Sequence, residues 1–120
     1  MENKLVSVVI ASFNAEKYIL DVLNSVKEQT YENLELIIAD DCSVDHTQQI
    51  ISDWLSEYQE RFIRVELLFA SENQGTCRNY NRAMKKSNGE YIKLVDGDDI
   101  LLPECIAMLV DECESKKLDL

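Results

Sequence analysis

Acidic and polar residues directly follow three apolar runs of the chain. Each run reads as a buried strand, and the residues after it are Ser12-Phe13-Asn14 after 5–11, Asp40-Asp41 after 34–39, and Asp96-Gly97-Asp98-Asp99 after 91–95. In an open α/β sheet, ligands bind in the crevice outside the carboxyl ends of the strands. The pattern therefore predicts that the three strand ends share one binding site.

The aspartates among these residues indicate a cation at that site. Five clustered carboxylates would repel one another unless a cation lay among them. Mg²⁺ and Mn²⁺ take oxygen ligands and commonly bridge carboxylates to phosphates. The predicted chemistry is a metal-dependent nucleotide or phosphate site. The alternatives are a solvated turn at 96–99 and helix caps at Asp40, Asp41 and Asp45, and capping is preferred for Asp45.

Strands and helices alternate around these motifs. We predict strands at 5–11, 34–39, 64–69 and 91–95, and helices from Asn14 to about 29, from Ser43 or Asp45 to about 58, from the loop at 71–75 to about 87, and from Pro103 onward. Asn14 is expected to be the N-cap of the first helix, and Trp54 to lie in the core. The alternation implies an open, mainly parallel α/β sheet with right-handed crossovers and helices on both faces.

Composition limits the classes of function. At 120 residues the chain forms one domain at most, and its net charge of −11 argues against nucleic acid and anionic lipid as partners. No run of 18 apolar residues is present, and no secretory signal is visible. The four cysteines have no CxxC spacing, which favours reduced thiols in a cytoplasmic protein over a zinc site or disulfides. His46 is expected to be exposed at a helix start.

Three segments together carry a resemblance to a known family. VSVVIASFN at 6–14, IADDCSVD at 38–45 and GEYIKLVDGDD at 89–99 resemble the nucleotide-sugar half of family 2 glycosyltransferases. The resemblance covers residues 5 to about 110 and implies a GT-A fold, here truncated, with inversion at the anomeric centre. It also implies that residues 1–120 form a single nucleotide-diphosphate-sugar-binding domain, the N-terminal part of a longer glycosyltransferase.

The resemblance also implies roles for individual residues. Ser12, Phe13 and Asn14 match the turn that lines the base and ribose, and Asp41 matches the aspartate that hydrogen-bonds the base. Asp96 should lie near the ribose or the metal, and Asp98 or Asp99 should bind Mn²⁺ or Mg²⁺ directly. That cation would stabilise the charge on the departing diphosphate. Arg78 is a candidate for contact with phosphate.

The chain departs from the family pattern at several positions. The usual proline is Ala11, and the usual glycine after the aspartate pair is Cys42, where the backbone is expected to need a positive φ. If Asn81 matches the family's asparagine, Tyr80 replaces the usual arginine and Ala83 the usual glycine. Arg78 lies two residues before Tyr80, the position of the usual arginine, and is therefore about 200° away from it on an ideal helix.

The resemblance further implies the reaction and its partners. The donor is expected to be a nucleotide sugar, with UDP favoured and GDP or dTDP left open, and the acceptor a glycan or lipid-linked molecule, as in polysaccharide biosynthesis. The general base of an inverting transfer is expected beyond Leu120, so this chain should bind donor without transferring sugar. Residues 118–120 read as a strand just beginning. An exposed sheet edge would favour a homodimer, and the full-length protein is expected at the inner face of the membrane.

Two other classes stay open at this point. A receiver-like signalling domain is also doubly wound, acidic at its strand ends and Mg²⁺-binding, but it needs acidic residues after its first strand, where this chain has Ser12-Phe13-Asn14. A non-catalytic nucleotide-binding module is the other alternative. Dinucleotide-binding and P-loop classes are excluded because their glycine motifs are missing.

Overall fold

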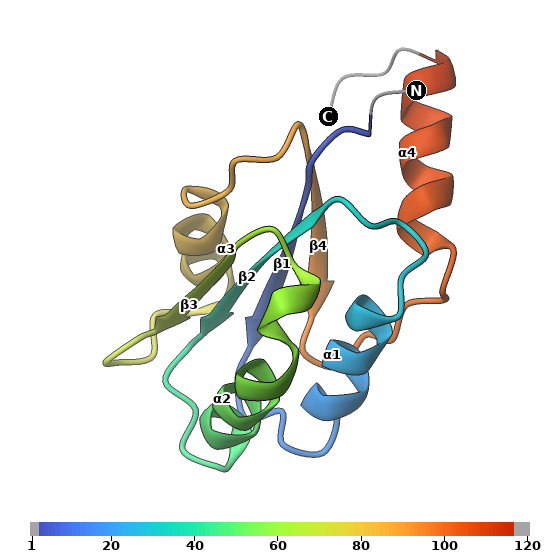
Figure 1. Ribbon diagram of the computed structural model, residues 1–120. Coiled ribbons are helices and arrows are strands. Elements are labelled where there is room, and N and C mark those ends of the chain that lie inside the picture. Colours follow the sequence, from blue (N-terminus) through green and yellow to red (C-terminus); the bar gives the residue numbers. More distant parts are fainter. Residues whose placement is uncertain (1–2, 117–120) are drawn as a thin grey trace.

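The computed structural model describes residues 3–116, which form a four-stranded parallel sheet flanked by helices (Figure 1). The elements are β1 (Val6–Ser12), α1 (Ile19–Lys27), β2 (Leu34–Asp40), α2 (Thr47–Tyr58), the short 3₁₀ helix η1 (Gln59–Arg61), β3 (Val65–Phe69), α3 (Thr76–Met84), β4 (Tyr91–Asp96) and α4 (Cys105–Lys116). The α/β architecture predicted from the sequence is therefore confirmed. The strand expected at 118–120 lies outside the described residues.

The strand order places β1 at the centre of the candidate site. The order across the sheet is β3-β2-β1-β4, and every pair is parallel. After β3 the chain crosses β2 and β1 to form β4 on the far side of β1, so the order reverses between β1 and β4. Such a reversal opens a crevice at the carboxyl ends of the strands. A receiver domain would instead have its third strand beside its first, so that alternative is wrong.

Both faces of the sheet are covered, and this explains the unbroken apolar runs of β1 and β2. Successive side chains of a strand point to opposite faces. Val8 and Ile10 pack on the side of α1 and α2, whereas Val9 packs with Ala83 of α3 on the other side. All residues of β1 and β2 are buried. Strands buried on both faces have no need of polar alternation.

The packing of α1 against α2 includes the single tryptophan. Trp54 is 3% exposed, which confirms its predicted place in the core. Its indole Nε1 donates to Asn24 Oδ1 at 2.9 Å, so the buried N–H is satisfied. The tryptophan thereby joins the two helices that cover one face of the sheet.

The first helix begins later than predicted, and Asn14 is not its N-cap. Asn14 has a φ of +49°, and its Oδ1 accepts a hydrogen bond from the Val44 amide at 2.9 Å. The helix starts at Ile19, after a turn in which the Tyr18 and Ile19 amides both donate to the Ala15 carbonyl. The Asn14 side chain, which the sequence pattern assigned to a helix end, thus forms a contact between two loops.

The other helix ends differ from prediction by only a few residues. α2 starts at Thr47 with His46 as its N-cap, so neither candidate cap, Ser43 or Asp45, occupies that position; Asp45 lies one residue earlier, and its Oδ1 accepts from the Thr47 amide at 2.9 Å. Burial alone would raise the pKa of Asp45, but hydrogen bonds from Thr47 and the Glu16 amide lower it. α3 ends at Met84 instead of near 87, and α4 starts at Cys105, because 103–104 form a turn.

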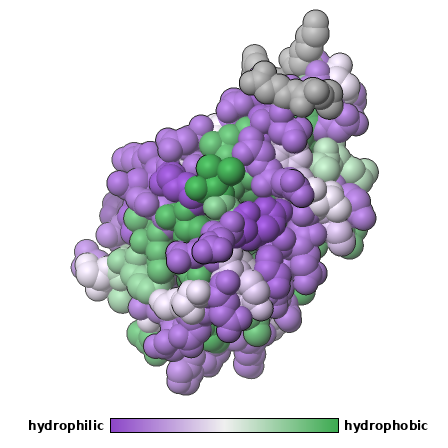
Figure 2. Space-filling view, viewed as in Figure 1, coloured by the Kyte–Doolittle hydropathy of each residue, from purple (hydrophilic) through white to green (hydrophobic). Residues whose placement is uncertain are grey.

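The surface combines strong acidity with local apolar patches. Figure 2 shows a mostly hydrophilic face with an apolar area over β3 and the segment that leads into it, where Ile63 is exposed. The four cysteines are free. Within residues 3–116, no helix has the length and apolarity needed to cross a bilayer.

Candidate nucleotide and cation site

A pocket of about 260 Å³ lies at the carboxyl ends of β1 and β4. Its lining comes from the ends of three strands, from the segment after β1 and from the first turn of α3: Ala11, Ser12, Phe13, Asn14, Ala15, Tyr18, Asp41, Thr76, Asn79, Asp96, Gly97 and Asp98. Six of the eight residues predicted from the sequence line it, namely Ser12, Phe13, Asn14, Asp41, Asp96 and Asp98. The three strand ends therefore border one pocket, and its use as a binding site stays a prediction.

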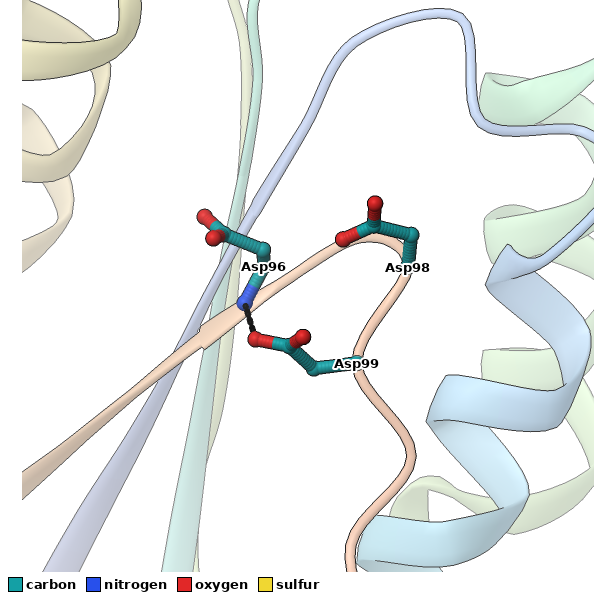
Figure 3. A group of neighbouring side chains, drawn as sticks. All are labelled: Asp96, Asp98 and Asp99. Carbon is teal, nitrogen blue, oxygen red and sulfur yellow. Dashed lines mark hydrogen bonds between the residues drawn. The ribbon is translucent and has the colours of Figure 1, made fainter.

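The turn after β4 gathers three exposed carboxylates. One oxygen from each of Asp96, Asp98 and Asp99 lies within 4.8 Å of the other two. Figure 3 shows the Asp98 and Asp99 side chains directed back from the turn toward Asp96, whose amide donates to Asp99 Oδ2 at 3.3 Å. None of the ion pairs found within residues 3–116 involves these three carboxylates. Three unpaired carboxylates fit the oxygen ligand set of Mg²⁺ or Mn²⁺.

Gly97 allows this turn to lie against the end of β1. A Cβ at Gly97 would come within 3.3 Å of the Cα and Cβ of Ser12 and within 3.2 Å of the Cβ of Ala15. These distances are shorter than ordinary van der Waals contact, so a larger residue would push the turn outward. The glycine of the Asp96-Gly97-Asp98-Asp99 motif thus brings the carboxylates to the pocket edge.

Tyr80 of α3 donates its hydroxyl to Asp96. The tyrosine is half-buried and packs against the apolar cluster of Val9, Ile37, Ala39 and Ala83. Burial, the hydrogen bond to Asp96 and the charges of the three carboxylates raise the pKa of Tyr80 above its ordinary value of 10.0. The hydroxyl is therefore protonated at neutral pH and acts as a donor.

Asp40 has a structural role beneath the pocket. It is fully buried and accepts hydrogen bonds from the Ser12 hydroxyl at 2.7 Å and from the Ser43 amide at 2.8 Å. Gln48 of α2 donates to the same carboxylate at 2.8 Å. Asp40 thus ties the ends of β1 and β2 to α2 and fixes Ser12 in the pocket wall.

Asp41 holds the loop between β3 and α3. Its two oxygens accept from the Gln74 amide at 2.7 Å and from the Gly75 amide at 2.9 Å, and its side chain is buried. Gly75 has a φ of +94°, a conformation that side chains disfavour. The next residue, Cys42, has a φ of +63°, which confirms the positive φ predicted there. Two backbone turns thus meet at this carboxylate.

Replacing Asp41 by asparagine should loosen this loop. An amide NH₂ would face one of the two backbone N–H donors, so one hydrogen bond would be lost and a partly buried donor left facing another donor. We expect the free energy of unfolding to fall by about 1–2 kcal/mol. Hydrogen exchange should accelerate at the Gln74 and Gly75 amides. Unchanged exchange there, relative to an Asp111→Asn control on the exposed face of α4, would contradict the assigned role.

Two aromatic side chains also line the pocket. Phe13 is 50% exposed and Tyr18 is 52% exposed, although both line the cavity. The segment that carries them is fixed by Asn14. Its backbone amide donates to Ser43 Oγ at 2.8 Å, and its side-chain Oδ1 accepts from the Val44 amide. Exposed aromatic faces beside a polar cavity suit stacking against a flat ligand.

The basic side chains and the histidine lie outside the cavity. Arg78 is exposed on α3 and does not line the pocket, so its contact with phosphate stays a prediction. Arg82 lies further along α3, where its Nη2 donates to Asn79 Oδ1 at 2.6 Å. His46 is exposed, as expected, and its Nδ1 lies 2.7 Å from Glu16 Oε2. Among residues 3–116, the pocket lining therefore includes acidic groups and no lysine or arginine.

Sequence reasoning missed the contribution of α3. Thr76 and Asn79 line the cavity, and Tyr80 contacts Asp96 from the same helix. Asn79 is also buried and donates to the Ala39 carbonyl at 2.8 Å. The signal in the sequence was the spacing of 76, 79, 80 and 83, which places these residues on one helical face. Polar residues on a face that packs against a sheet indicate a site at that face.

Comparison with known proteins identifies the class. The family model described as "Glycosyl transferase family 2" matches residues 7–120, and the chain belongs to this family. It is 38% identical over 95 residues to the putative teichuronic acid biosynthesis glycosyltransferase TuaG of Bacillus subtilis, a match covering 79% of this chain and 36% of that protein. The resemblance found in the sequence motifs is thereby confirmed.

Solved structures agree with this assignment and confirm the GT-A fold. The crystal structure of Staphylococcus aureus TarS residues 1–349 with UDP has a TM-score of 0.79 and 30% identity, covering 92% of this chain and 32% of that one. The mannosyltransferase PcManGT of Pyrobaculum calidifontis, solved with GDP-Man and Mn²⁺, shares the fold at a TM-score of 0.76 and 24% identity, covering 83% of this chain and 29% of that one. The chain spans about 36–39% of the length of the first curated relatives it matches.

Proposed function

We propose that residues 1–120 form a single donor-binding domain of an inverting glycosyltransferase that uses a nucleotide diphosphate sugar. The observation that carries this proposal is one pocket, at the reversal of strand order, that is lined by Asp41, Asp96 and Asp98 together with two aromatic side chains. TarS, 30% identical to this chain, has been solved with UDP and with UDP-GlcNAc. This supports a UDP-linked donor.

The charge of the pocket supports a cation-dependent donor site. Asp41, Asp96 and Asp98 line it, and no lysine or arginine of the described residues 3–116 does, so a diphosphate would be repelled in the absence of a cation. Asp98 and Asp99 would hold Mn²⁺ or Mg²⁺, with Asp96 near the ribose or the cation. The cation would supply the positive charge that stabilises the departing diphosphate.

The other side of the pocket would hold the nucleoside. Ser12, Phe13 and Asn14 would contact base and ribose, with the ring of Phe13 or Tyr18 stacked on the base. Each Asp41 oxygen already accepts one backbone hydrogen bond, and a carboxylate oxygen can accept two. Asp41 thus retains acceptor capacity for an N–H of the base.

We further propose that sugar transfer needs a general base from outside residues 3–116. Asp41 is held by two amides, and the other carboxylates at the pocket are assigned to donor and cation, so none is left to take a proton from an acceptor hydroxyl.

The acceptor would be a glycan or lipid-linked molecule of polysaccharide biosynthesis. The four free thiols fit a reducing, cytoplasmic location. A place of the full-length protein at the inner face of the membrane stays a prediction. A homodimer through an exposed sheet edge stays a prediction.

Calorimetric titration of the 120-residue chain with UDP tests this function. We expect binding in the presence of Mn²⁺ and much weaker binding with EDTA, because the pocket cannot otherwise neutralise the diphosphate. GDP in a parallel titration reports base selectivity. Circular dichroism must show that the chain is folded. A folded chain that binds no nucleotide with or without Mn²⁺ would overturn the proposed function.

A further inference from the structure

We propose that Tyr80 is a positioning residue that holds the Asp96 carboxylate in the orientation in which it meets the donor and its cation. The inference rests on the proposed function for its biological meaning. The contact between the two side chains can be tested without it. Tyr80 lines no part of the pocket, so it would act only through Asp96.

Tyr80 is rigidly placed. It lies in the middle of α3 and packs against the apolar cluster that Val9, Ile37 and Ala39 of the sheet form with Ala83 of its own helix. A ring fixed by packing on a sheet has few accessible rotamers. Its hydroxyl is therefore held at one point in space, at the carboxyl end of β1 and β4.

Asp96, in contrast, has little else to fix its side chain. Its backbone ends β4 and pairs with Ala11 of β1, and its amide donates to Asp99 Oδ2. Its side chain is exposed, and within residues 3–116 the Tyr80 hydroxyl is the sole hydrogen-bond donor to its carboxylate. Without that donor, the carboxylate could turn into solvent, away from Asp98 and Asp99.

The hydrogen bond has two consequences at the site. It engages Oδ1 of Asp96, whereas Oδ2 accepts no hydrogen bond within residues 3–116 and is the more available oxygen for the donor or the cation. The hydroxyl dipole also stabilises the negative charge of Asp96, one of three neighbouring carboxylates, and so offsets part of their mutual repulsion before a cation binds. Groups that hydrogen-bond a metal-binding carboxylate orient it, and their loss typically lowers metal affinity about tenfold or more.

The first test needs no metal and no nucleotide. The chain is labelled with ¹³C at the aspartate carboxyl carbons, and the Asp96 signal is assigned with Asp96→Asn. We expect Tyr80→Phe, which keeps the ring and removes the hydroxyl, to shift the Asp96 signal and leave the signals of aspartates on α1, α2 and α4 in place. Tyr91→Phe is the matched control, because Tyr91 donates to Glu114 at the other end of β4.

The second test measures Mn²⁺ binding in the presence of UDP by the electron paramagnetic resonance signal of free Mn²⁺. Tyr80→Phe should weaken Mn²⁺ binding roughly tenfold or more, whereas Tyr91→Phe should bind like wild type. An unshifted Asp96 signal together with wild-type Mn²⁺ affinity in Tyr80→Phe would overturn the inference.

The outcomes separate this inference from the proposed function. If the folded wild-type chain binds neither Mn²⁺ nor UDP, the proposed function fails, and the carboxyl signal alone decides whether Tyr80 holds Asp96. If Tyr80→Phe fails to fold, the reverse variant decides: Asp96→Ala removes an exposed side chain and must shift the Tyr80 Cζ signal. No shift there would also overturn the inference.

Discussion

Replacing Asp98 by alanine is expected to abolish Mn²⁺-dependent UDP binding. Asp98 is the one predicted cation ligand that also lines the pocket, and its carboxylate points back toward Asp96 (Figure 3). Losing about 3 kcal/mol of charge stabilisation corresponds to roughly a 100-fold loss of UDP affinity. Calorimetric titration with UDP at saturating Mn²⁺ measures this change.

The variant should leave the fold intact, which makes the binding result interpretable. Asp98 is exposed, and its carboxylate makes no hydrogen bond within residues 3–116. Thermal unfolding of Asp98→Ala should therefore match that of wild type. Asp111→Ala, on the exposed surface of α4, removes the same charge far from the pocket and should bind UDP normally. Equal UDP affinity in Asp98→Ala and Asp111→Ala would contradict the assignment of Asp98 to the cation.

The largest expected effect on stability comes from a buried glutamate at the opposite end of the sheet. Glu35 is 1% exposed, and its carboxylate accepts hydrogen bonds from the Ser7 hydroxyl, from the Asn88 amide at 2.6 Å and from Arg64 Nε at 3.2 Å. It joins β2 to β1 and to the turn before β4. Glu35→Gln removes the charge and turns one acceptor into a donor that faces other donors. We expect a loss of about 2–3 kcal/mol in the free energy of unfolding at pH 7, measured in urea.

The pH dependence of this loss identifies the ionised carboxylate as its cause. Burial alone would raise the pKa of Glu35, but the hydrogen bonds from Asn88 and Ser7 and the charge of Arg64 outweigh it, so the pKa is lowered from 4.5. The folded state therefore holds the proton less tightly than the unfolded state. The stability that Glu35 adds is present above pH 4.5 and is lost as the pH falls through its lowered value.

The difference in stability between wild type and Glu35→Gln should accordingly shrink below pH 4.5. Other carboxyl groups titrate equally in both proteins, so they cancel in the comparison. Glu112→Gln is the matched control, because Glu112 pairs with Lys116 on the exposed surface of α4. An exposed pair of this kind should contribute less than about 1 kcal/mol. A constant difference between wild type and Glu35→Gln from pH 7 to pH 3.5 would show that packing, and not charge, explains the loss.

Sequence patterns were sufficient for the element order and for most of the pocket. Buried parallel strands produce continuous apolar runs, and the residues that end them must lie at one edge of the sheet. Ser12, Asp40 and Asp96 are in fact the last residues of β1, β2 and β4. The same reasoning did not locate the cap of α1, because Asn14 contacts Val44, and that contact forms only when two loops meet.

The sequence by itself determined the family, the α/β alternation and the acidic strand ends, because each depends on residues close together in the chain. Only the tertiary structure decided which side chains serve the site and which support it. Asp41 reaches the amides of Gln74 and Gly75, and Tyr80 reaches Asp96, after the chain has crossed the sheet. Such contacts depend on how α3 and its loop pack against the strands. The packing is set by the whole core, so no local pattern in the sequence records it.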